Sequence, residues 1–83
     1  MSDLLAGMRE NPAANWRIAD IETVCNTFGV RCKPPSGGGS HYKVSHPSQG
    51  YIVTIPFRRP IKSVYILKFV RYVEAVRDAN AQP

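Results

Sequence analysis

The sequence predicts one α+β domain, in which a three-stranded antiparallel sheet carries two helices on one face and a short helix precedes them. Two long segments have apolar residues at three- and four-residue spacing, which indicates helices with one buried side. Between them, three short runs alternate apolar and polar residues and end at proline or glycine, as strands do. We expect residues 1–15 to form a short helix and linker, residues 16–78 the domain, and residues 79–83 a frayed tail.

Proline and glycine delimit the helices that precede the sheet. Residues 2–10 are expected to form a short helix that ends before Pro12, because proline cannot continue the helical hydrogen-bond ladder. A second helix is expected over residues 17–28, with Asn15 as a candidate N-cap and Gly29 just after its end. Its predicted buried stripe consists of Ile18, Ile21, Val24, Cys25 and Phe28.

The expected strands are residues 30–33, 40–46 and 51–56, joined by a glycine-rich loop and a short turn. The final helix is expected to begin at Lys62 or Ser63 and to run to about Asp78. The buried stripe of this helix should contain Ile66, Phe69, Val70, Val73 and Val76, and its solvent face Lys68, Arg71, Glu74 and Arg77.

Side chains alternate across a strand, so the strand residues divide into two sets. The set expected to face the helices is Val30, Cys32, Tyr42, Val44, Tyr51, Val53 and Ile55. The set expected on the open face is Arg31, Lys33, His41, Lys43, Ile52 and Thr54. A helix, three strands and a helix in this order are the plan of the double-stranded-RNA-binding domain fold, which by itself does not fix a function.

The chain is basic, because 11 lysines and arginines against 6 acidic residues give a net charge of +5 and a pI near 9.6. This balance favours a polyanionic partner such as a nucleic acid. No apolar run approaches the roughly 18 residues that cross a bilayer, and the N-terminus lacks the order of a secretory signal. We therefore expect a cytoplasmic protein with no membrane partner.

Cys25 and Cys32 are expected to be ordinary buried thiols rather than a disulfide or a metal site.

His41 is the candidate catalytic residue, because it is expected on the open basic face beside the glycine-rich loop. RNA supplies its own nucleophile in the 2′-hydroxyl group, so cleavage needs a base, an acid and cationic stabilisation, and no metal ion. The alternative is that His41 is simply a surface residue of a strand. His46 is expected on the opposite face of the strand, near the turn, where it could meet His41 only through a bulge.

Several cations accompany His41 in the expected arrangement. Lys33 and Lys43 share the open face with it, and Arg58, Arg59 and Lys62 cluster where the chain enters the last helix, whose N-terminal amides favour phosphate. A solvated run of charges is the alternative interpretation of the second cluster.

Other catalytic motifs are absent from the sequence. It has no phosphate-binding P-loop, no Gly-x-Ser-x-Gly elbow and no Cys/His metal spacing. Asp20, Glu22 and Glu74 fall at helix positions expected to face solvent, so no carboxylate pair indicates a metal nuclease. We expect no cofactor and no bound metal.

An ordered set of residues in this chain resembles the HicA family of ribonuclease toxins. The residues that carry the likeness are Gly39, Ser40, His41, His46, Pro47, Thr54, Ile55, Pro56, Ile61 and Lys62. Residues 16–22 are also similar to a longer branch of the family, and the resemblance covers residues 16–74. Many family members have a second histidine where this chain has Tyr42, and a histidine where it has Phe57, Arg58 and Arg59.

The resemblance implies a double-stranded-RNA-binding-like fold and cleavage of messenger RNA without a metal ion. It places the catalytic histidine at His41 and RNA contacts at Gly39 and Ser40. It also implies neutralisation by a HicB-like antitoxin that covers the site, and it leaves open a homo-oligomer or a toxin–antitoxin hetero-oligomer.

Two further classes of function fit the same residues. A non-catalytic RNA-binding module of the same fold would show salt-sensitive RNA binding without cleavage. A protein-interaction subunit whose basic face binds an acidic partner would fail to bind RNA even at modest salt.

Overall fold

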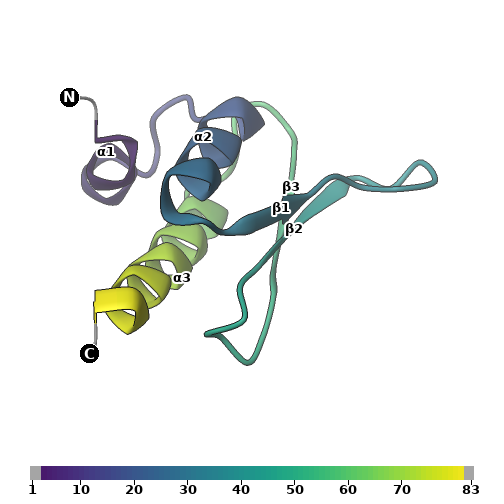
Figure 1. Ribbon diagram of the computed structural model, residues 1–83. Coiled ribbons are helices and arrows are strands. Elements are labelled where there is room, and N and C mark those ends of the chain that lie inside the picture. The colour runs from purple at the N-terminus through teal and green to yellow at the C-terminus, as the bar shows by residue number, and fades with distance from the viewer. Residues whose placement is uncertain (1–2, 82–83) are drawn as a thin grey trace.

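The computed structural model describes residues 3–81. Within them the chain forms three helices and three strands (Figure 1). Their bounds in chain order are α1 Leu4–Glu10, α2 Ile18–Phe28, β1 Arg31–Lys33, β2 His41–Ser45, β3 Val53–Pro56 and α3 Ser63–Ala81. The expected order of two helices, three strands and a final helix is confirmed.

The strands form one open antiparallel sheet in the order β1-β2-β3, as expected of a meander. In its centre, Val44 of β2 pairs with Cys32 of β1 on one side and with Val53 of β3 on the other. The glycine-rich loop between β1 and β2 projects away from the helices (Figure 1).

The core lies between the sheet and the helices. α2 contacts β1 and α3 contacts β3, and the alternation along the strands decides which side chains reach this core. Val44 and Ile55 are fully buried, whereas Lys43 and Thr54 next to them are exposed. Tyr51 was expected to point inward but is 59% exposed. The reason is that β3 begins two residues later, so the alternation of the strand does not extend to Tyr51.

At the ends of α2, the expectation for the C-terminal end is confirmed and the expectation for the N-cap is wrong. Gly29 ends the helix with a φ of 69°, in the left-handed region that glycine enters without strain. The N-cap is Arg17 rather than Asn15, because the backbone N–H of Arg17 donates a 3.0 Å hydrogen bond to Oδ2 of Asp20. The carboxylate of Asp20 thus stabilises the first turn of α2.

α1 belongs to the same core as the rest of the chain. Leu5 and Met8 are buried in one cluster with the apolar side chains of α3. Arg9 forms a 2.6 Å ion pair with Glu74, which was expected on the solvent face of α3 and is instead partly covered by α1. α3 itself runs to Ala81, so the frayed tail expected from residue 79 is helical as far as the structure describes it.

The two cysteines lie against each other between α2 and β1. Both thiols are free, Cys25 is buried as expected and Cys32 is half-buried. A hydrogen bond from Cys25 to Cys32 raises the pKa of Cys25, together with burial, and lowers the pKa of Cys32. Separately, no helix within residues 3–81 is long and apolar enough to cross a membrane.

Candidate active site

His41 is the first residue of β2 and lies at the end of the sheet that is nearest the glycine-rich loop. It pairs with Pro56, the last residue of β3. Its side chain is exposed, as is that of Lys43 on the same face of β2. The open-face position expected for His41 is therefore confirmed.

Two surface hollows meet at His41, and Ser40 and His41 line both of them. The smaller, of about 240 Å³, is lined by Lys33, Pro34, Pro35, Ser36, Gly39, Ser40, His41 and Lys43. The larger, of about 640 Å³, is lined by Ser40, His41, Pro56, Arg58, Arg59, Pro60, Ile61, Lys62 and Tyr65. The eight residues expected to act together on RNA therefore gather around one imidazole ring.

The ring of His41 is oriented by the residue before it. The hydroxyl oxygen of Ser40 lies 3.1 Å from Nδ1 of His41, a hydrogen-bond distance. Among residues 3–81, Nε2 of His41 has no hydrogen-bond partner. One ring nitrogen is thus held by Ser40, and the other is available to a substrate.

Gly39 has a structural role that the sequence did not reveal. A Cβ atom at this position would lie 3.3 Å from Cβ of Pro35 and 3.4 Å from the carbonyl oxygen of Ser36. Glycine therefore lets the loop fold closely against Pro35, which forms one wall of the smaller hollow.

The segment between β3 and α3 carries Arg58, Arg59 and Lys62, all of them exposed. Ile61, in the same segment, is 2% exposed and donates a 3.1 Å backbone hydrogen bond to the carbonyl oxygen of Trp16. This hydrogen bond attaches the segment to the rest of the chain. Because His41 pairs with Pro56, the residue just before the segment, the segment begins beside the start of β2. The sequence predicts this basic cluster but not its position beside His41.

No acidic side chain neutralises these cations within residues 3–81. The ion pairs of this part of the chain join Arg9 to Glu74 and Arg77 to Asp78. Neither pair includes Lys33, Lys43, Arg58, Arg59 or Lys62, which are the five cations that line the two hollows. The surface around His41 is therefore electropositive and suited to phosphate groups.

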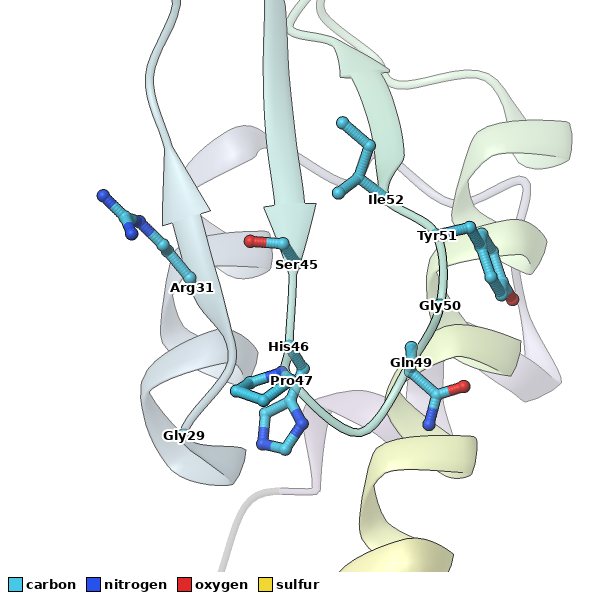
Figure 2. A pocket seen from close by; sticks show the side chains of 9 residues that line it. All are labelled: Gly29, Arg31, Ser45, His46, Pro47, Gln49, Gly50, Tyr51 and Ile52. Carbon is cyan, nitrogen blue, oxygen red and sulfur yellow. The ribbon is translucent and has the colours of Figure 1, made fainter.

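Arg31 and His46 lie at the opposite end of the sheet. Arg31 is on the open face as expected, but it pairs with Ser45 and lines a separate hollow of about 490 Å³ with His46. Figure 2 shows the Arg31 side chain pointing away from the His46 ring. Nδ1 of His46 accepts a 3.1 Å hydrogen bond from the backbone N–H of Ser48, in the turn after β2. His46 thus follows the last residue of β2, near the turn as expected, and does not lie beside His41.

The side chains that commonly bind metals are dispersed in this fold. Within residues 3–81, no group of three or more His, Cys, Asp or Glu side chains is placed to hold a metal ion.

Comparisons of the chain with family models, curated proteins and solved structures found no match.

Proposed function

We propose that this chain is a cytoplasmic endoribonuclease toxin similar to HicA, which cleaves messenger RNA at His41 without a metal ion. The observation that carries the proposal is the position of His41, exposed where two hollows meet that together contain five lysines and arginines. A histidine surrounded by cations suits proton transfer at a phosphodiester. We also propose that a HicB-like antitoxin protein neutralises the enzyme by covering this surface.

The order of the elements supports a double-stranded-RNA-binding-like fold as part of the proposal. α2, β1, β2, β3 and α3 follow one another as in that fold, with an open antiparallel sheet. In this arrangement the helices occupy one side and leave the other face of the sheet to a ligand.

The proposed reaction uses the RNA's own nucleophile. The 2′-oxygen attacks the adjacent phosphorus atom, the bond to the 5′-oxygen of the next nucleotide breaks, and a 2′,3′-cyclic phosphate and a 5′-hydroxyl result. A base takes the proton of the 2′-hydroxyl group, and an acid gives a proton to the leaving 5′-oxygen. We assign one of these transfers to Nε2 of His41, because imidazole exchanges protons readily near neutral pH.

The cations stabilise the negative charge that grows on the phosphate oxygens during the attack. Arg58, Arg59 and Lys62 line the larger hollow, and Lys33 and Lys43 line the smaller one. An RNA strand that crosses His41 would meet lysine or arginine on both sides of the scissile phosphate. Ionic contacts of this kind are expected to make binding strongly dependent on salt.

A non-catalytic RNA-binding module is the second candidate, and one observation favours it. His46, the other histidine of the chain, lies at the far end of the sheet, where its Nδ1 accepts a hydrogen bond from the backbone N–H of Ser48. Tyr42 stands where many HicA toxins have a second histidine, and residues 57–59 stand where many have a further one. A second proton-transfer group must therefore come from another residue type or from water.

One experiment separates the candidates. Purified wild type, His41→Ala and His46→Ala are incubated with a long unstructured RNA in EDTA, and products are resolved by gel electrophoresis. We expect cleavage by wild type and His46→Ala and none by His41→Ala. Because an exposed residue contributes little to the fold, the His41→Ala protein should stay folded, and its loss of cleavage would then reflect the loss of the imidazole. RNA binding without product would support the binding module, and no binding at low salt would support a protein-interaction subunit.

A further inference from the structure

β3 has a free edge, because it is the last strand of the sheet. The backbone N–H of Phe57 donates to the carbonyl oxygen of Ser40, which makes these two residues a hydrogen-bonded pair of the antiparallel ladder. The pairing then places the backbone groups of Ile55 and Val53 toward β2. Those of Thr54, between them, point away from the sheet, so its N–H and C=O are available to another strand.

The opposite edge of the sheet, β1, offers fewer free backbone groups for pairing than β3 does. β1 has three residues and is followed directly by Pro34 and Pro35, which lack a backbone N–H. Short strands and prolines are the means by which proteins protect an edge from pairing. Along β3, the only proline is Pro56 at the end of the strand. β3 is therefore the edge that is open to an additional strand.

A groove runs along this edge between β3 and α3. It has a volume of about 420 Å³ and is lined by Tyr51, Ile52, Val53, Thr54, Tyr65, Lys68 and Arg71. Tyr51 and Ile52 are 59% and 52% exposed, respectively, so apolar surface accompanies the unpaired backbone. An extended peptide binds such an edge through main-chain hydrogen bonds and places alternate side chains against the neighbouring helix.

The charge of the groove defines its occupant. Tyr65, Lys68 and Arg71 follow at three-residue spacing on α3, which brings them to the same side of the helix. Every charged residue that lines the groove is a cation. A second copy of this chain would bring its own lysine and arginine to the same place, and the like charges would repel. An acidic segment has the complementary charge.

We propose that the edge of β3 binds an extended acidic segment of a partner protein as a fourth strand of the sheet. Acidic side chains of the segment would face Lys68 and Arg71, and its alternate apolar side chains would lie beside Ile52 and Thr54. The main chain of the segment would pair with the N–H and C=O of Thr54. This binding does not depend on RNA cleavage, because Thr54, Lys68 and Arg71 do not line the hollows around His41.

The proposal is tested with a short synthetic peptide that alternates valine and glutamate, labelled for fluorescence anisotropy. The control peptide has lysine in place of glutamate. Thr54→Pro removes an N–H that the sheet does not use and blocks the edge, and Thr54→Val keeps the N–H as a matched control. The double variant Lys68→Glu with Arg71→Glu reverses the charge of the groove without touching the sheet.

We expect the wild type and Thr54→Val to bind the glutamate peptide equally, and Thr54→Pro to bind it about tenfold more weakly, through the loss of main-chain hydrogen bonds. The charge-reversed variant should lose the glutamate peptide and bind the lysine peptide. Hydrogen exchange of the Thr54 amide should slow when the glutamate peptide is bound.

Three outcomes would overturn the proposal. The first is no binding of the glutamate peptide at millimolar concentration, or equal binding by Thr54→Pro. The second is protection of the Thr54 amide by RNA and not by the peptide, which would make the groove part of the RNA surface. The third is a wild-type dimer in sedimentation that Thr54→Pro converts to a monomer, which would make a second copy the occupant.

Discussion

The hydroxyl group of Tyr72 donates a 2.9 Å hydrogen bond to the backbone carbonyl oxygen of Tyr51. The two rings also meet edge to face, with centroids 5.2 Å apart and planes at 88°. Tyr72 is fully buried in α3, whereas Tyr51 lies in the segment that leads into β3. This contact therefore attaches the turn between β2 and β3 to the core helix.

Tyr72→Phe should reduce the free energy of unfolding by about 1 kcal/mol, because it removes this hydrogen bond and keeps the ring. The loss of unfolding free energy should not exceed this value, because Tyr51 is 59% exposed and water can replace the lost hydrogen-bond donor. Urea unfolding of the two proteins measures the difference. Tyr65→Phe is the matched control, since the Tyr65 hydroxyl group has no hydrogen-bond partner within residues 3–81. Equal losses in both variants would contradict the prediction.

The same tyrosine should make stability depend on pH in the alkaline range. Burial raises the pKa of Tyr72 above its ordinary value. The stabilisation is therefore complete below the ordinary tyrosine pKa of about 10 and is lost as pH rises from there through the pKa of the folded state, because the unfolded chain ionises first. The stability difference between wild type and Tyr72→Phe, measured by urea unfolding from about pH 8 to about pH 11, should shrink above about pH 10. A constant difference would show that Tyr72 ionises equally in both states.

Removal of cations beside His41 should lower the salt dependence of RNA binding. For single strands, the slope of log affinity against log salt concentration changes by about 0.7 for each phosphate that a cation ceases to neutralise. Arg58→Gln with Arg59→Gln should therefore flatten the slope by about 1.4. Arg77→Gln removes a cation that is paired with Asp78 near the end of α3, and it should leave the slope unchanged. Equal slopes for all three proteins would place the RNA on another surface.

Gly29→Ala should destabilise the protein by about 1–2 kcal/mol, because alanine is strained in the left-handed conformation at a φ of 69°. The cost should come from the backbone alone, since a Cβ atom at Gly29 would meet nothing within 4 Å. Gly50→Ala is the control: it has equally open space and no positive φ. Thermal unfolding of both variants should show a lower midpoint for Gly29→Ala only.

The elements of the fold could be predicted where a local rule decided them. Gly29 ended α2 because few other residues adopt its conformation, and the apolar spacing of α2 and α3 identified their buried sides. The end of α3 was expected at about Asp78, shortly after Val76, the last residue of the apolar stripe. The helix continues to Ala81 because no proline or glycine stops it before that residue.

The composition of the candidate site was predictable, and its assembly was only partly so. Alternation along β2 placed His41 and Lys43 on the open face. The approach of Arg58 and Arg59 to His41 depends on the register between β2 and β3, in which His41 pairs with Pro56. No pattern in the sequence fixes that register. The groove beside Thr54 was missed for a similar reason, because Lys68 and Arg71 were interpreted as a solvent face of α3 without reference to the strand next to it.

The shared core of α1 and α3 has a consequence for the speed at which the protein folds. Leu5 and Met8 are buried in one cluster with apolar side chains of α3, although the whole sheet lies between α1 and α3 in the sequence. Contacts between segments this far apart form only after the intervening chain has closed into a loop, and that closure costs conformational entropy. The strands pair with their neighbours along the chain and can form earlier, so completion of the helical core is expected to limit the folding rate.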